Sequence, residues 1–209
     1  MGPTKRRILE HAAAVASTDG LERVTIGRLA DDLGMSKAGL YGHFGSKERL
    51  QLETVALGVE IFQRHVVAPA QQAPPGLPRL WAICTAYLAY VAAGVFPGGD
   101  FFVTVANEYD TRTGPVRDQI AAAIAYWMHR LESLIAEAVN LGHLTPCDPA
   151  QLAFEVEALL VAGNHMYHLA NDPKALELAR TGIARRLEDL RTPEAPALAE
   201  EPQPAPAGS

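Results

Sequence analysis

Two lysines, Lys37 and Lys47, each directly follow a serine that can cap a helix, Ser36 or Ser46. Each lysine would lie at the positive end of a helix dipole, where a cation costs on the order of 0.3–1 kcal/mol unless an anion shares the site. A phosphate there would meet backbone N–H groups and a lysine together. This arrangement predicts the binding of a polyanion.

Surface lysines are common, so either lysine alone would mean little. Two lysines at equivalent places, with Tyr41 and His43 as further donors that could reach phosphates, favour nucleic acid as the polyanion.

The helices that must position these side chains are short and regularly punctuated. Apolar residues recur at i, i+3, i+4 and i+7 in Ile26, Leu29, Ala30 and Leu33. Thr25 can cap this helix and Gly34 can end it, and Leu40 and Phe44 share the inward face of the next helix. Two short helices joined by a tight turn containing glycine predict a helix-turn-helix, whose second helix enters the DNA major groove.

The segment from Ile8 to Leu52 resembles the DNA-binding domain of the TetR/AcrR family of bacterial transcriptional regulators, most specifically in SKAGLYGHFGSKERL. Carried over by position, the resemblance implies base-edge contacts from Lys37, Ala38 and Gly39. It also implies phosphate contacts from Thr25, Tyr41, His43 and Lys47. The chain departs from the family at Gly42, where an aromatic residue or arginine is frequent, so one groove-facing side chain is missing.

The 209 residues carry a net charge of −6, which by itself argues against DNA binding. The charge is uneven, however: residues 1–50 hold eight Lys/Arg and six Asp/Glu, or +2, and the remainder holds ten and eighteen, or −8. This asymmetry separates a nucleic-acid-binding end from an acidic body.

Cys84 and Cys147 are far apart and show no CxxC spacing, which fits a reducing cytoplasm and argues against a disulfide framework or a thiolate zinc site. Residues 1–20 lack the apolar stretch of a signal peptide. The uncharged stretch from residue 80 to 99 is interpreted as a buried helix, with a membrane span as the weaker alternative.

The whole chain is predicted to be all-α, with an N-terminal three-helix helix-turn-helix domain (residues 1–50) and a C-terminal helical bundle (residues 51–191) for ligand binding and dimerisation. Its first helix is expected from Thr4 to Thr18, with a basic start that could touch DNA or be a solvated tail. A long helix from Ser46 to about Val67, ended by Pro69, would join the two domains.

Further helices are expected in the body at residues 78–95, 99–110, 115–140, 149–171 and 173–191. The tail from residue 192 to 209 holds five prolines and is predicted to be disordered.

The last two body helices have long apolar faces, which favours a four-helix dimer interface. Leu187 belongs to a stripe with Leu176, Ala179, Ile183 and Leu190, and the preceding helix offers Leu152, Val156, Leu159, Gly163 and Met166. The alternative is that both faces pack inward within one subunit. A dimer is preferred because a helix-turn-helix protein gains specificity by spanning two half-sites.

The resemblance also implies an effector pocket in the body, and aromatic or mildly polar side chains are its candidate walls. The candidates are Trp81, Cys84, Tyr87, Phe102, Tyr126, Trp127 and Met166. Such a cluster is more often plain core. Asp100 stands where some members of the family have cysteine, and no role is assigned to it.

His165 and His168 have a spacing that can hold a metal, but no third ligand is visible, so neither a metal nor a cofactor is predicted. The expected function is a cytoplasmic, homodimeric, ligand-responsive regulator, not an enzyme, that is released from a palindromic operator DNA by an unidentified small-molecule effector, with no membrane partner. The alternatives are a helical small-molecule-binding protein or enzyme with a vestigial helix-turn-helix, and a nonspecific DNA-packaging protein, which the acidic body disfavours.

Overall fold

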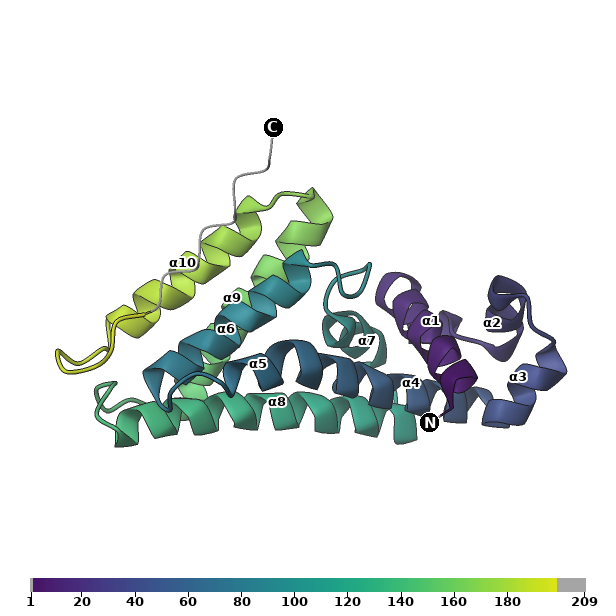
Figure 1. The fold of residues 1–209 in the computed structure, drawn as a ribbon, viewed down its shortest axis with the longest axis horizontal. Coiled ribbons are helices and arrows are strands. Elements are labelled where there is room, and N and C mark those ends of the chain that lie inside the picture. Colours follow the sequence, from purple (N-terminus) through teal and green to yellow (C-terminus); the bar gives the residue numbers. More distant parts are fainter. Residues whose placement is uncertain (1, 199–209) are drawn as a thin grey trace.

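The computed structural model describes residues 2–198, and all regular elements in that range are helices (Figure 1). Three of them form one end of the molecule: α1 (Pro3–Asp19), α2 (Ile26–Leu33) and α3 (Lys37–Phe44). The body contains five further helices: α6 (Leu77–Ala92), α7 (Phe101–Tyr109), α8 (Pro115–Asn140), α9 (Pro149–Ala170) and α10 (Lys174–Glu188). The prediction of an all-α chain with an N-terminal helix-turn-helix is confirmed.

Local side-chain chemistry explains why α2 and α3 form where they do. The Thr25 hydroxyl oxygen accepts a hydrogen bond from the Arg28 N–H at 3.2 Å, and the Ser36 hydroxyl oxygen accepts one from the Gly39 N–H at 3.0 Å. Gly34 ends α2 at a φ of 63°, a left-handed conformation that glycine adopts without a steric cost. The predicted caps and stop of the helix-turn-helix are therefore confirmed.

The helix that joins the two ends is α4 (Lys47–Phe62), which is capped by Ser46 and lies alongside α8 in Figure 1. It passes without interruption into a π-helical stretch, Gln63–Val67, and then α5 (Ala68–Ala70). Pro69 does not end the helix as predicted. It lies in the first turn of α5, after the register has changed, where its missing N–H is tolerated.

The Phe101 ring at the start of α7 packs directly against α4 at Gly58. A Cβ atom on Gly58 would lie 2.9 Å from two carbons of this ring, which is itself fully buried. Only glycine fits at this contact without a shift of the Phe101 ring.

The stripe predicted to form the dimer interface is instead part of the subunit core. Ile183 and Leu187 are fully buried within the single chain, as are Leu152 and Val156. Packing inward was the alternative, and it accounts for these residues. The large apolar side chains that stay exposed on α9 and α10 are Phe154, Met166, Leu169 and Leu178, at 65, 49, 73 and 69%.

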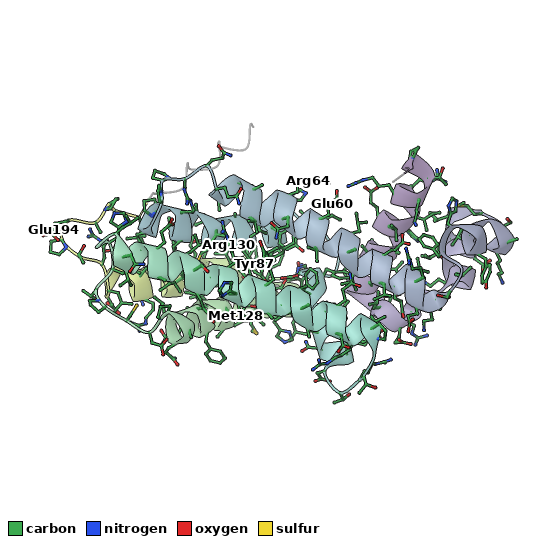
Figure 2. The ribbon with its side chains drawn as sticks, turned by 90° about the horizontal axis from the view of Figure 1, so that it is seen from below. Glu60, Arg64, Tyr87, Met128, Arg130 and Glu194 are labelled. Carbon is green, nitrogen blue, oxygen red and sulfur yellow. The ribbon has the colours of Figure 1, made fainter. Side chains whose placement is uncertain are left out.

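The two ends of the described chain also differ from expectation. Lys5 and Arg6 form neither a solvated tail nor a free basic patch, because they pair with Glu53 and Glu60 on α4 (Glu60 is labelled in Figure 2). Disorder from residue 192 is wrong for residues 192–198, since the Thr192 N–H donates to the His143 carbonyl at 3.2 Å and Ala195 is buried. The rest of the predicted disordered segment, residues 199–209, lies outside the described residues.

Within residues 2–198, no helix combines the length and the apolar character needed to cross a bilayer.

Candidate DNA-binding surface and ligand cavity

The side chains predicted to contact DNA lie mostly on the exposed face of α3. Lys37, Ala38, Gly39 and His43 are exposed, and Tyr41 is 59% exposed. Lys37 forms no ion pair with any residue from 2 to 198. Thr25 is half-buried and its oxygen accepts the cap bond, which leaves the hydroxyl proton available for a phosphate. These positions suit a helix that enters a groove, and their roles remain predictions.

Lys47 is not the uncompensated cation that its place after Ser46 indicated. Its ammonium group lies 2.7 Å from the Glu22 carboxylate, on the loop between α1 and α2. This pair supplies the anion that the helix N-terminus lacked in the sequence-based argument, so that part of the argument is wrong. A phosphate would have to share or displace this contact.

Glu22 also connects the DNA-binding end to the body, because two side chains from the body contact its carboxylate. The Tyr109 hydroxyl, at the end of α7, donates to the Glu22 carboxylate at 2.6 Å, and the Arg112 guanidinium lies 3.1 Å from it. Hydrogen bonds from Lys47 and Tyr109 lower the pKa of Glu22 to about 2. The Gln51 side-chain amide also donates to Glu22, at 3.4 Å, so Glu22 is ionised at any physiological pH and contacts four side chains at once.

A second carboxylate, Glu108 on α7, binds backbone N–H groups of the segment between α1 and α2. Glu108 accepts hydrogen bonds from the N–H groups of Leu21, at 2.5 Å, and Glu22, at 3.1 Å. One turn earlier in α7, the Thr104 hydroxyl donates to the Ser17 carbonyl of α1 at 3.3 Å. The nine residues of α7 thus dock directly onto the helix-turn-helix end.

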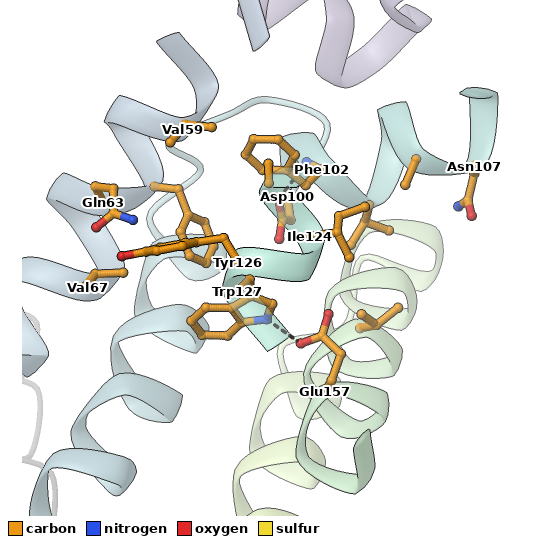
Figure 3. A pocket seen from close by; sticks show the side chains of 15 residues that line it. Val59, Gln63, Val67, Asp100, Phe102, Asn107, Ile124, Tyr126, Trp127 and Glu157 are labelled. Atoms are coloured by element: carbon orange, nitrogen blue, oxygen red, sulfur yellow. Dashed lines mark hydrogen bonds between the residues drawn. The ribbon is translucent and has the colours of Figure 1, made fainter. Parts of the chain in front are cut away.

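A cavity of about 410 Å³ lies in the body between α4, α7, α8 and α9 (Figure 3). Its walls are mainly aliphatic and aromatic, with a few polar groups among them. The lining residues are Val59, Phe62, Gln63, Val67, Asp100, Phe102, Val103, Ala106, Asn107, Ala123, Ile124, Tyr126, Trp127, Glu157 and Val161. This volume is within the range of small-molecule sites in proteins.

Three of the seven predicted pocket residues line this cavity: Phe102, Tyr126 and Trp127. The other four do not. Tyr87 is buried one layer behind, stacked on Trp127 with 6.3 Å between ring centroids, and Trp81 and Cys84 are also core residues. Burial raises the pKa of the Cys84 thiol to about 12, so it is inert. Met166 is exposed on the outer face of α9.

Asp100 places a buried carboxyl group on the α7 side of the cavity. It is 4% exposed and caps α7 by accepting a hydrogen bond from the Phe102 N–H at 2.8 Å. Its own N–H donates to the Asn164 side-chain oxygen at 2.9 Å. Burial raises the pKa of the carboxyl group to about 6, against the opposing effect of the hydrogen bond from Phe102.

Glu157 brings a second carboxyl group to the cavity from α9. Its side chain accepts a hydrogen bond from the Trp127 indole N–H at 2.7 Å (Figure 3). Burial raises the pKa of Glu157 to about 7, and the nearby Asp100 carboxylate adds to the shift. At neutral pH, Glu157 is therefore divided between its charged and neutral forms.

The domains of the chain match known protein families over most of its length. Residues 8–54 match the family described as "Bacterial regulatory proteins, tetR family", and residues 76–183 match "Tetracyclin repressor-like, C-terminal domain".

The chain belongs to the tetR family of bacterial regulatory proteins.

Individual relatives of this tetR-family protein are distant. The uncharacterized HTH-type transcriptional regulator YfiR of Bacillus subtilis (strain 168) is 23% identical over 145 residues, which cover 68% of each chain. A TetR transcriptional regulator from Chloroflexus aurantiacus J-10-FL is 22% identical and superposes with a TM-score of 0.83 over 90% of this chain and 96% of its own. AibR, solved with isovaleryl coenzyme A and operator DNA, is 24% identical, with a TM-score of 0.69 over 90% and 97%. At such identities the structures share the fold.

Glu157 is a charged cavity residue of this tetR-family protein that sequence reasoning missed. It lies four residues after Ala153 and three before Leu160, both fully buried, so helical periodicity alone puts it on the buried side of α9. A charged residue within such a stripe was the signal available. His165 and His168 are not joined by a third metal-binding side chain, because no group of three or more such side chains occurs among residues 2–198.

Proposed function

We propose that this tetR-family protein is a repressor that binds a near-palindromic operator as a homodimer and leaves it when a small molecule fills the cavity. A bacterial chromosome lies in the cytoplasm, so we place its action there. One observation carries the proposal: α7 lines the cavity and also docks on the DNA-binding domain. Phe102 and Ala106 line the cavity, and Glu108 and Tyr109 form hydrogen bonds with the segment between α1 and α2.

Because α7 contains only nine residues, a ligand that displaces its cavity-lining side chains also moves Glu108 and Tyr109. Glu22 and the N–H groups of the α1–α2 loop would follow, and through Glu22 so would Lys47 at the start of α4. α4 itself borders the cavity with Val59 and Phe62. Filling the cavity would therefore change the distance between the recognition helices of a dimer, which must lie about 34–36 Å apart, or a multiple of this, on DNA.

The apolar surface left exposed on α9 and α10 supports a dimer. Phe154, Met166, Leu169 and Leu178 are large apolar side chains that are about half exposed or more in the single chain. Large apolar side chains exposed on two neighbouring helices favour an interaction site there. We propose that this outer face, rather than the buried Leu187 stripe, forms the contact between subunits.

AibR, which has the same fold, was solved with both isovaleryl coenzyme A and operator DNA. A small molecule and operator DNA are thus both compatible with this architecture, and the proposal assigns the cavity to binding without turnover. The alternative, an enzyme with a vestigial helix-turn-helix, requires catalysis at the cavity and no sequence-specific binding of DNA.

The test begins with selection of an operator from randomised DNA by the full-length protein. A cavity-filling variant, Ala123→Trp, should then bind that operator about 5- to 150-fold more weakly, the usual range for coupling between two sites. The control is Ala122→Trp, which adds the same side chain to the exposed face of α8. Circular dichroism and light scattering would show that both variants keep their helices and assembly.

Failure to enrich any DNA sequence would refute the regulator. An Ala123→Trp variant that folds and binds the operator as tightly as the control would refute the assignment of the cavity to release.

A further inference from the structure

The cavity contains two acidic groups and no basic one. Asp100 and Glu157 are the only charged residues among those that line it, and they come from different helices, α7 and α9 (Figure 3). Neither carboxyl group lies within ion-pair distance of a lysine, arginine or histidine belonging to residues 2–198. The mutual repulsion of Asp100 and Glu157 contributes to the raised pKa of Glu157.

The hydrogen bonds within the protein compensate these carboxylates only in part. Asp100 accepts one from the Phe102 N–H, and the Tyr87 hydroxyl and the Val103 N–H also stabilise its charged form, whereas Glu157 accepts one from the Trp127 indole. A carboxylate offers about four acceptor positions, and burial of an unpaired charge is costly. The raised pKa values of about 6 and about 7 are the consequence. A cation in the cavity would remove this cost.

Aromatic rings form much of the remaining wall. Phe62 and Trp127 meet edge to face with 5.0 Å between centroids, and Phe102 and Tyr126 border the same space. The negative face of an aromatic ring attracts a cation within about 6 Å, most strongly when water is excluded. Aliphatic side chains of α4, α7 and α8 fill the rest of the wall and suit apolar substituents.

We propose that the ligand of this cavity is an organic cation, a quaternary or protonated amine that carries apolar groups. Its positive centre would lie between the carboxylates of Asp100 and Glu157, and its apolar part against the aromatic wall. The inference rests on the proposed function in one respect, that the cavity holds the effector. It goes further by giving the sign of the ligand's charge.

The fold alone does not determine that sign. AibR was solved with isovaleryl coenzyme A, whose phosphates make it an anion, and in the present chain two carboxylates would repel an anion placed beside them. The distinction therefore depends on the two acidic residues and can be tested on them directly.

A matched series of three probes isolates charge from shape: benzyltrimethylammonium, the neutral 2-methyl-1-phenylpropan-2-ol and the anionic 2,2-dimethyl-3-phenylpropanoate. Isothermal titration calorimetry measures the binding of each probe to the full-length protein. The pH is 8, because both carboxyl groups are then ionised. We expect the cation to bind about 10-fold or more tightly than the alcohol, and the anion to bind most weakly.

Asp100→Asn and Glu157→Gln remove the charges with little change in volume. Asparagine can still cap α7, and glutamine can still accept from Trp127. The double variant should bind the cation and the alcohol with affinities within about threefold of each other. The tenfold preference expected of the wild type corresponds to about 1.4 kcal/mol of binding free energy. Asp118→Asn, which removes an exposed carboxylate from α8, should keep the wild-type preference.

The proposal is overturned if the alcohol or the anion binds as tightly as the cation, if the double variant keeps the preference, or if none of the three binds at millimolar concentration. The proposed function fails in a different way. A cation that binds with the expected selectivity but leaves operator affinity unchanged would uphold the charge assignment and refute the role as effector.

Discussion

Glu157 should make the stability of the empty protein depend on pH, and Glu157→Gln should remove that dependence. The pKa of this carboxyl group is about 7 in the fold, against 4.5 for an ordinary glutamate. Between these two values the folded state holds a proton that the unfolded state has lost. The contribution of Glu157 to stability therefore falls as the pH rises from about 4.5 to about 7, because the folded state binds more protons in this window.

The size of the effect follows from the shift in pKa. Each unit is worth about 1.4 kcal/mol, and with some allowance for water in the cavity the ionised Glu157 costs on the order of 2–3 kcal/mol at pH 8. Glutamine carries no titrating proton. The stability of the Gln variant minus that of the wild type should therefore increase by on the order of 2–3 kcal/mol between pH 4 and pH 8, or roughly 5–10 °C in Tm for a chain of this size.

Urea denaturation at fixed protein concentration, followed by circular dichroism at several pH values, measures this difference. Titrating groups that do not interact with Glu157 cancel because they are common to both proteins, and constant concentration keeps the contribution of assembly the same. Asp100 does interact with Glu157, so the difference measures Glu157 together with its coupling to Asp100. Asp118→Asn is the control, since an exposed carboxylate should give a difference that hardly changes with pH. If Glu157→Gln and the wild type differ by the same amount at pH 4 and pH 8, Glu157 is not held in a neutralising environment and the reasoning is wrong.

Three further predictions concern DNA, assembly and release. Lys47→Ala should weaken binding to all DNA alike and reduce the salt dependence of the affinity by about one phosphate contact. Lys37→Ala should also cost roughly 1–3 kcal/mol of discrimination at one base pair. Fluorescence anisotropy titrations on operator and random DNA would contradict this if both variants lost the two affinities in equal proportion. Phe154→Glu should give helical monomers by light scattering, whereas Leu187→Glu should unfold the protein because it buries a charge in the subunit core; a Phe154→Glu variant that stayed dimeric would place the interface elsewhere. Tyr126→Ala should impair release by a cationic ligand and leave operator binding by the empty protein within a few-fold, as competition titrations can show; lost operator binding with an intact ligand response would make Tyr126 structural.

The elements that could be predicted from sequence are those determined by near neighbours. The caps of α2 and α3 join residues only three apart, Thr25 with Arg28 and Ser36 with Gly39. Proline and glycine signals likewise placed both ends of α8 at the observed residues, Pro115 and Asn140. In each case the physical cause lies within one turn of the helix.

The errors concern contacts between distant segments. Lys47 pairs with a glutamate 25 positions earlier, and Tyr109 bonds to the same glutamate from 87 positions later, so neither partner is visible in a local pattern. The stripe containing Leu187 was apolar enough for either a core or an interface, and only its burial decides between them. For the pocket, aromatic character selected Tyr87 together with Trp127, although just one of these stacked rings reaches the cavity.

The close contact between Gly58 and the Phe101 ring has a consequence for genetics. Any side chain at this position must push the Phe101 ring, and with it α7, away from α4. Such a displacement resembles the one we propose for a bound effector, but it would be permanent. A screen for colonies that express the controlled genes without inducer should therefore recover substitutions at codon 58, which encodes neither a groove-facing residue nor a cavity wall. Replacement of this glycine in α4 would then give inducer-independent expression that passes to all progeny.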